Sequence, residues 1–239
     1  MSVYYNENNP FAAQWLRALI HHGLIANGHV DERSIEDVTP NDLSGYDQHH
    51  FFAGIGGWSF ALRLAGWPDD RPVWTGSCPC QPFSAAGKGK GFADERHLWP
   101  AFEWLIRQHG PATVFGEQVA RKAGREWLAV VRSDLEMSGY AFGASDLCAA
   151  SAGAWHDRPR HYWVAHAVRL QQSRQEPCRR TIGRMGRIVQ SVSWDTGWPE
   201  ALRQFRGVDD GLSYGVDITD GFRNAIVPPL AKAFIESAI

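Results

Sequence analysis

The sequence has little of what marks several common classes of protein. Its cysteines (Cys78, Cys80, Cys148 and Cys178) show neither the usual two-residue spacing nor the paired histidines of a zinc site, so we expect no metal and reduced thiols. No apolar run approaches the roughly 20 residues of a membrane span, and the N-terminus lacks the apolar stretch of a signal peptide. We therefore expect a cytoplasmic protein that does not contact membranes.

The sequence also lacks a large excess of positive or negative charge. The chain has 24 Lys and Arg against 26 Asp and Glu, a net charge of −2, so the protein as a whole is not a polycation. Its 239 residues and 44% apolar content suffice for one α/β domain with a small appendage. Eleven tryptophans are many for this length, and we expect some of them in the core.

Short apolar runs alternate with segments of helical periodicity along most of the chain, which predicts an α/β fold. The expected strands cover residues 3–5, 29–35, 73–75, 112–115 and 140–147, and another ends at residue 52. The expected helices cover residues 11–21, 58–65, 98–108 and 125–138, and a further helix follows Pro229.

The most informative stretch is Thr75–Ser84, because it carries Cys80 between two prolines just after a strand. Glycine and proline stop a strand sharply, so Cys80 is expected on a turn at a strand end, where α/β folds place reacting groups. The alternative is an inert buried thiol, since unpaired cysteines are among the most buried residues. The following run, Ala85–Phe92, is rich in glycine and carries Lys88 and Lys90, which favours phosphate contacts and a loop that closes.

A second glycine-rich turn, Ala53–Gly57, lies between an expected strand and an expected helix. Glycines allow a ligand to approach the backbone closely, and the N-terminus of a helix is electropositive, so this arrangement suits a nucleotide. An ordinary turn is the alternative, because turns use glycine for conformational reasons alone.

Several of these strings together resemble the cytosine-5 DNA methyltransferases. The strings are Pro-Cys-Gln-Pro-Phe-Ser from Pro79, Gly-Lys-x-x-Gly-Phe-x-Asp-x-Arg from Gly87, Phe-Ala-Gly-Ile-Gly-Gly from Phe52, and Asn-Ala-Ile-Val-Pro from Asn224. The resemblance implies a Rossmann-like methyltransferase fold with a mostly parallel, doubly wound sheet. It also implies transfer of a methyl group from S-adenosylmethionine to C5 of a cytosine flipped out of double-stranded DNA.

The resemblance assigns the catalytic residues one by one. Cys80 corresponds to the nucleophile that adds to C6 of the base, and Glu117 to the acid that faces N3. Arg158 and Arg160, two residues apart on a strand, point to the same side and correspond to the pair that holds the base O2 and lowers the thiol pKa. Gln118 and His156 depart from the family's Asn and Gln at these motifs. The alternatives are a surface Glu117 and a basic strand edge.

The family's order of cofactor motifs does not fit between Gly54 and Cys80, because that interval is too short for two more strand–helix units. The segment Val3–Ala13, however, resembles the family's Asn-Glu segment, and Val30–Val38 resembles the next strand end. We therefore expect a permuted order, in which Glu7 accepts hydrogen bonds from the ribose hydroxyls. A solvated N-terminal Glu7 is the alternative.

The residues that the resemblance implies for ligand contacts form two sets. The adenine contact is left open between Ser34 and Asp31. The cofactor set is Phe52, Ala53, Gly54, Ile55, Gly56, Gly57, Glu7, Asn8, Asp31, Ser34, Ile35, Pro79, Leu98 and Asn224. The DNA set is Gln81, Ser84, Lys88, Lys90 and Arg96.

A basic segment interrupts the expected catalytic domain, which comprises residues 1–166 and 207–239. Residues 167–206 contain eight arginines against three acidic residues and occupy the family's target-recognition position. A segment this short predicts a short or relaxed target site; a solvated disordered loop is the alternative. We expect a monomer on DNA. RNA as the substrate, transfer of a group larger than methyl, and a remnant that binds DNA without chemistry also stay open.

Overall fold

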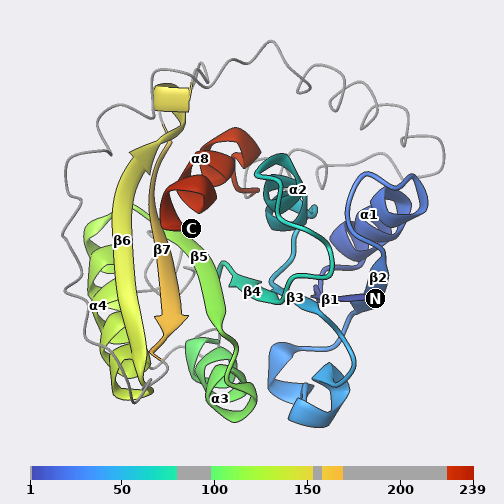
Figure 1. Cartoon of the computed structure of the whole chain (residues 1–239), viewed down its shortest axis with the longest axis horizontal. Coiled ribbons are helices and arrows are strands. Elements are labelled where there is room, and N and C mark those ends of the chain that lie inside the picture. Colours follow the sequence, from blue (N-terminus) through green and yellow to red (C-terminus); the bar gives the residue numbers. More distant parts are fainter. Residues whose placement is uncertain (1, 80–97, 153–157, 169–224) are drawn as a thin grey trace, which may run out of the picture.

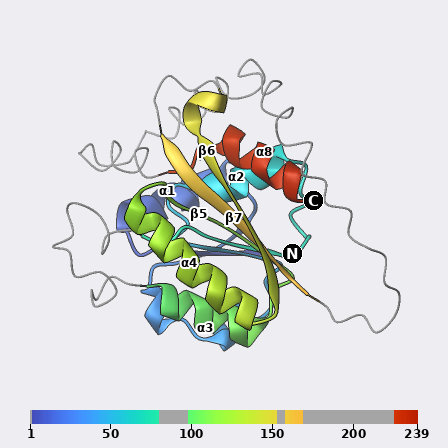
Figure 2. The same cartoon turned by 90° about the vertical axis from the view of Figure 1, so that its left-hand side faces the viewer.

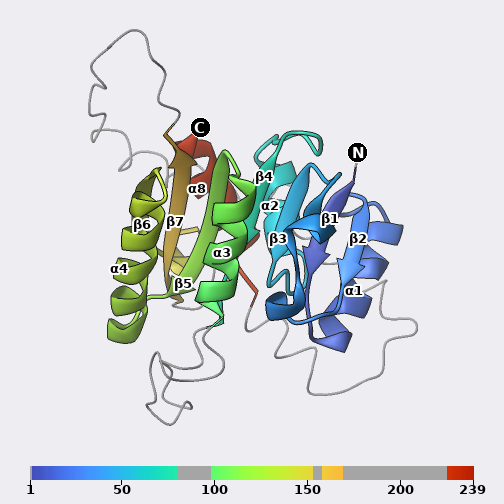
Figure 3. The same cartoon turned by 90° about the horizontal axis from the view of Figure 1, so that it is seen from below.

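Within the part of the chain that the structure describes, seven strands form one sheet in the order β2-β1-β3-β4-β5-β7-β6, which Figure 3 shows from below. The computed structural model describes residues 2–79, 98–152, 158–168 and 225–239. The strands are β1 (Val3–Asn6), β2 (Gly28–Asp31), β3 (Gln48–Phe51), β4 (Val73–Gly76), β5 (Thr113–Val119), β6 (Tyr140–Cys148) and β7 (Pro159–Ala167). The first five strands in this order are parallel. β7 runs antiparallel to β5, and β6 runs antiparallel to β7. The predicted mostly parallel α/β sheet is confirmed.

Helices cover both faces of this sheet (Figures 1 and 2). The α-helices are α1 (Pro10–His21), α2 (Gly57–Leu64), α3 (Trp99–His109), α4 (Lys122–Met137) and α8 (Pro228–Ala238). Short 3-10 helices are η1 (Ile35–Asp37), η2 (Pro40–Leu43) and η5 (Ala149–Ala152). Helices α3 and α4 share one apolar core with η1 and η2, whereas α2 and α8 enclose a second core, and α1 a third. The doubly wound arrangement is therefore confirmed as well.

The residues around Asn9 and Pro10 fix where α1 begins, at the carboxyl edge of the sheet. The Asn9 side chain accepts a hydrogen bond from the backbone N–H of Ala12, and Pro10 occupies the first turn, where its missing N–H costs nothing. Trp15, Leu16 and Leu19 then bury one face of the helix against the sheet. This fixes the position of the loop that joins β1 to α1.

Two expected strands differ from the observed ones by more than one residue at an end. The strand expected over 29–35 ends at Asp31, because the Ser34 side chain caps η1 and turns the chain. The strand expected over 112–115 instead continues to Val119 as the central partner of β4 and β7. Gly116 permits this continuation, since a Cβ there would lie 2.2 Å from the Trp163 indole. Glu117 is thus held on a strand rather than on a loop.

The centre of the sheet contains two neutral histidines. His49 Nε2 donates to the Leu43 carbonyl at 2.9 Å, and His50 Nδ1 lies 2.8 Å from Thr75 Oγ1; both residues are 1% exposed. Burial lowers the pKa of His49 to about 4 and that of His50 to about 3. Between about pH 4 and 6.5, these two histidines therefore bind protons in the unfolded chain but stay neutral in the folded protein.

Stability should consequently fall as the pH drops from 7 to 5. Unfolded histidine has a pKa of about 6.5, so each buried histidine costs about 2 kcal/mol of unfolding free energy over this interval. Burial raises the pKa of Glu7 and Glu117, and these carboxyls act in the opposite direction. Urea unfolding at several pH values should therefore be compared between the wild type and His50→Gln. Between pH 7 and pH 5, the unfolding free energy of the variant should fall by about 2 kcal/mol less than that of the wild type. The same fall in both proteins would contradict this account.

Candidate active site

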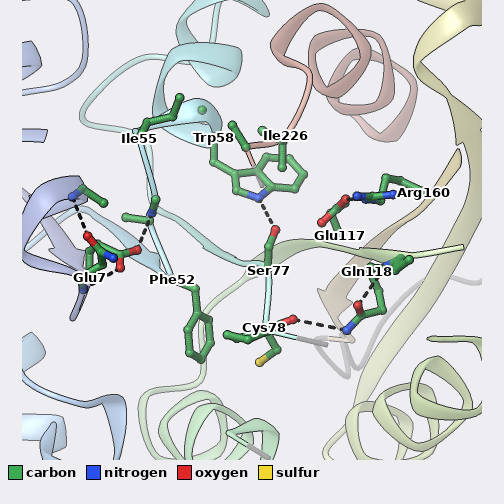
Figure 4. Close-up of a pocket in the computed structure, with 18 of the residues that line it drawn as sticks. Glu7, Phe52, Ile55, Trp58, Ser77, Cys78, Glu117, Gln118, Arg160 and Ile226 are labelled. Atoms are coloured by element: carbon green, nitrogen blue, oxygen red, sulfur yellow. Dashed lines mark hydrogen bonds and ion pairs between the residues drawn. The ribbon is translucent and has the colours of Figure 1, made fainter. Parts of the chain in front are cut away.

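A cavity of about 460 Å³ opens at the carboxyl edge of the parallel strands. Its wall includes the β1–α1 loop, the glycine turn after β3, the exit of β4, the ends of β5 and β7, and the start of the segment before α8. The lining residues are Glu7, Asn9, Phe11, Ala12, Phe52, Ala53, Gly54, Ile55, Gly57, Trp58, Ser77, Cys78, Pro79, Glu117, Gln118, Val119, Arg158, Arg160, Ala225 and Ile226. Figure 4 shows Glu7 on one side, Glu117 with Arg160 on the other, and Trp58 with Ser77 between them.

The glycine turn leaves β3 in a conformation that L-residues rarely adopt. Phe52 has φ 51°, Gly54 has φ 55° and Gly56 has φ 80°. Helix α2 begins at Gly57, so its first N–H groups face the cavity edge. Phe52, Ala53, Gly54, Ile55 and Gly57 all line the cavity, whereas Gly56 faces away, toward the side chains of Ile25, Leu16 and Leu19.

Glu7 joins this turn to the end of β1. Its Oε2 accepts a hydrogen bond from the Gly54 N–H at 2.7 Å, and its Oε1 accepts one from the Asn9 N–H at 3.0 Å. Parallel pairing of β1 with β3 brings these groups together, although 47 residues separate Glu7 and Gly54 in the chain. Burial raises the pKa of the Glu7 carboxyl, and the two backbone N–H groups oppose this. Asn8 is exposed and does not line the cavity.

Both residues considered for the adenine contact lie outside the cavity lining. The Asp31 carboxylate accepts hydrogen bonds from the Arg33 backbone and guanidinium and from the Tyr4 hydroxyl. Burial opposes ionisation of Asp31, but these hydrogen bonds outweigh it and lower its pKa to about 2. Ser34 caps η1, and Ile35 is buried in the apolar core. The structure therefore assigns all three a role in holding the β2–η1 turn.

Hydrogen bonds from two neighbouring elements fix Ser77 and Cys78, the residues that follow β4. The Trp58 indole N–H donates to Ser77 Oγ at 3.0 Å, and the Gln118 amide donates to the Cys78 carbonyl at 3.3 Å. Pro79 follows and lines the cavity. Gln118, which departs from the family's Asn, thus ties the strand end that precedes Cys80 to β5. Leu98 precedes α3 and packs against the apolar core rather than lining the cavity.

Several predicted residues lie outside the described part of the chain. These are Cys80, Gln81, Ser84, Lys88, Lys90, Arg96, His156 and Asn224. The structure does bear on the neighbouring thiol, Cys78, which is 5% exposed among the aromatic side chains of the core. Burial raises its pKa well above that of an ordinary thiol, so Cys78 is a poor nucleophile.

The other end of the cavity carries a carboxylate beside two arginines. Glu117 is 7% exposed, and its Oε1 lies 2.5 Å from Arg160 Nε. Arg158 Nε is buried and makes no hydrogen bond within the described residues. Burial raises the pKa of Glu117, against the opposing charges of Arg160 and Arg158. Burial and the neighbouring Arg160 lower the pKa of Arg158. The end as a whole suits a planar polar group that accepts from arginine and exchanges a proton with a carboxyl.

Sequence reasoning missed several lining residues. Phe11, Trp58, Ser77 and Ile226 each lie within a few residues of a motif that was identified. Trp58 follows the glycine turn directly, and Ser77 ends a parallel strand, so both could have been inferred from their positions. Phe11 and Ile226 could not, because periodicity alone does not distinguish a core residue from a cavity wall.

No helix among the described residues is long and apolar enough to cross a membrane. Within the same residues, no group of His, Cys, Asp and Glu side chains could hold a metal ion.

Comparisons with known proteins agree with the motifs. Residues 67–192, just over half of the chain, match the family model "C-5 cytosine-specific DNA methylase". Type II methyltransferase M.HhaI of Haemophilus parahaemolyticus is 33% identical over 99 residues, which are 40% of this chain and 30% of the relative. Type II methyltransferase M.HaeII of Haemophilus aegyptius is 26% identical over 166 residues, or 68% of this chain and 44% of the relative.

Among solved structures, a DNMT2 mutant of Spodoptera frugiperda is similar, with 18% identity and a TM-score of 0.46, over 72% of this chain and 45% of that chain. In each of these pairs the matched part is less than half the length of the relative. The family model, by contrast, matches more than half of this chain and includes β4, β5 and β7 with Glu117, Arg158 and Arg160. The chain therefore belongs to the C-5 cytosine-specific DNA methylase family.

Proposed function

We propose that this protein transfers a methyl group from S-adenosylmethionine to C5 of a cytosine that is flipped out of double-stranded DNA. The observation that carries the proposal is a single cavity that joins the Glu7–glycine-turn end to the Glu117–arginine end. The Pro79 residue that precedes Cys80 lines the same cavity. A donor and an acceptor can therefore meet in one cavity beside the proposed nucleophile.

The glycine-turn end fits the cofactor. A cavity of about 460 Å³ is within the range that holds such ligands, and the carboxylate of Glu7 is an acceptor that suits a ribose diol. We infer that Glu7, Phe52, Ala53, Gly54, Ile55 and Gly57 hold S-adenosylmethionine, together with Asn224, which is outside the described residues. The cofactor supplies an electrophilic methyl group when bound.

The permuted motif order is part of this proposal. β1, with Glu7 at its end, precedes β3 in the chain but lies beside it in the sheet, and β2 lies beyond β1. This strand order supports the inference that β1 and β2 take the places of the family's second and third strands, and β3 that of the first.

At the other end of the cavity, the chain's own groups would activate the base. The Cys80 thiolate would add to C6, and the electron pair of the C5=C6 double bond would move toward C5 and N3, which makes C5 nucleophilic. A protonated Glu117 donates to N3 as this charge develops, and Arg158 and Arg160 bind O2. C5 would gain the methyl group and leave S-adenosylhomocysteine. A base would then remove the C5 proton, the Cys80 thiolate would leave C6, and the N3 proton would return to Glu117, which restores the ring.

The DNA contacts complete the proposal. Gln81, Ser84, Lys88, Lys90 and Arg96 would contact DNA around the flipped base, the lysines through phosphates, and these residues lie outside the described part of the chain. The basic segment 167–206 would read the target sequence beside a catalytic domain of residues 1–166 and 207–239.

Methyl transfer should depend on Cys80 and on duplex DNA. Purified protein is incubated with S-adenosylmethionine and cytosine-containing duplex DNA, and nucleosides are then quantified by mass spectrometry. We expect 5-methylcytosine with the wild type and none above background with Cys80→Ala, because no thiolate adds to C6. Product on RNA but not on duplex DNA would overturn the substrate assignment, and undiminished product with Cys80→Ala would overturn the covalent route.

Glu117→Gln should lower the single-turnover rate about a hundredfold, since the amide cannot release a proton to N3. In the wild type, the rate should fall at high pH as Glu117 ionises, and the variant should lose this alkaline limb. Arg160→Met offers a matched control: removal of the guanidinium beside Glu117 raises the pKa of that carboxyl, so the alkaline limb should move to higher pH. An alkaline limb at the same pH in all three proteins would exclude Glu117 as the acid.

Glu7→Gln should weaken S-adenosylmethionine binding about tenfold or more, because a charged acceptor for the ribose hydroxyls is lost. Isothermal titration calorimetry measures this directly. Asn8→Ala serves as the control, since Asn8 is exposed next to Glu7 and does not line the cavity. Equal affinity in Glu7→Gln and in the wild type would remove the support for a displaced ribose-binding strand.

A further inference from the structure

The glycine-turn end of the cavity lacks the side chains that sequence reasoning assigned to the adenine ring. Asp31 is engaged by Arg33 and Tyr4, Ser34 caps η1, and Ile35 is in the core; none of them lines the cavity. If the cavity holds S-adenosylmethionine, as proposed above, then its purine would meet residues of the cavity lining near Glu7.

Phe11 is suited to this by position. It is the second residue of α1, lines the cavity and is partly exposed. Its ring centroid lies 6.1 Å from that of Trp15, which follows one helical turn later and is 3% exposed. Trp15 therefore packs beside the Phe11 ring.

Helix α1 is also fixed against the glycine turn, so Phe11 and Ile55 are held at the same end of the cavity. A Cβ at Gly56 would lie 3.2 Å from the side chains of both Leu16 and Ile25, which shows how closely the helix and the turn approach. Phe11 and Ile55 pack against the same apolar cluster and both line the cavity. The hydrogen bond from Gly54 to Glu7 ties the two segments together at the cavity floor.

We propose that Phe11, with Ile55, forms the apolar wall on which the adenine ring of the cofactor stacks. A purine has two flat faces that gain by leaving water, and a packed aromatic ring binds such a face at little cost in conformational entropy. The β1–α1 segment then supplies two neighbouring contacts to one nucleoside: Glu7 to the ribose and Phe11 to the base. This inference rests on the proposed function.

The test is calorimetric binding of S-adenosylmethionine, S-adenosylhomocysteine and adenosine to the full chain. Phe11→Ala should weaken all three by about tenfold to a hundredfold, and by a similar factor, because all three share the stacked base. Phe11→Tyr should retain wild-type affinity within about twofold, since the aromatic face is kept. Phe11→Leu should lie between Phe11→Ala and the wild type, because it keeps apolar area but not the flat ring.

Ile20→Ala is the matched control for packing. Ile20 is a partly buried residue of the same helix that packs against the same cluster but does not line the cavity. It should leave the three affinities unchanged even where it lowers the unfolding temperature. Wild-type affinity in Phe11→Ala, or an equal loss in Ile20→Ala, would overturn the inference while leaving the proposed function in place. Failure of the wild type to bind S-adenosylmethionine would overturn both.

Discussion

The hydrogen bond between the Gly54 N–H and the Glu7 carboxylate is the interaction on which the site depends. It exists because β1 and β3 are parallel and adjacent, so that Glu7 and the glycine turn leave the sheet at the same edge. The same edge receives the exits of β4 and β5 and, because β7 is antiparallel, the beginning of β7. One sheet edge thus gathers the glycine turn, Pro79, Glu117 and the two arginines around one cavity.

The two ends of this cavity differ in their electrostatics, and this difference matches the two halves of the proposed reaction. Two backbone N–H groups hold the Glu7 carboxylate in place. In this position it can accept hydrogen bonds from neutral donors such as hydroxyls. Two opposing influences act on the pKa of Glu117: burial favours the protonated form, and the two neighbouring arginines favour the carboxylate. A carboxyl under such opposing influences can give up and regain a proton as charge develops beside it, which suits an acid that faces a ring nitrogen.

Much of this arrangement could be predicted from the sequence, for reasons specific to each element. The ends of β3 and β4 were recognisable because these two apolar runs stop at or just before a glycine. The extra length of β5 was not, since Gly116 resembles a strand terminator until the indole of Trp163 is seen to occupy the space of its missing side chain. Asp31 and Ser34 show a different limit: their residue types suit a ligand, but in the fold they form hydrogen bonds with Arg33, Tyr4 and Glu36.

The central claim is that Cys80 forms a covalent bond to C6 of a cytosine held in this cavity, and trapping that bond tests it most directly. Duplex DNA that carries 5-fluorocytosine is incubated with the protein and S-adenosylmethionine, and the products are resolved by denaturing electrophoresis and intact mass spectrometry. Fluorine cannot leave C5 as a proton does, so elimination is blocked and a stable protein–DNA adduct that bears one added methyl group should accumulate, with peptide mapping placing it at Cys80. Methylation of ordinary duplex DNA without any adduct to the fluorinated DNA, or an adduct at a residue other than Cys80, would contradict the account.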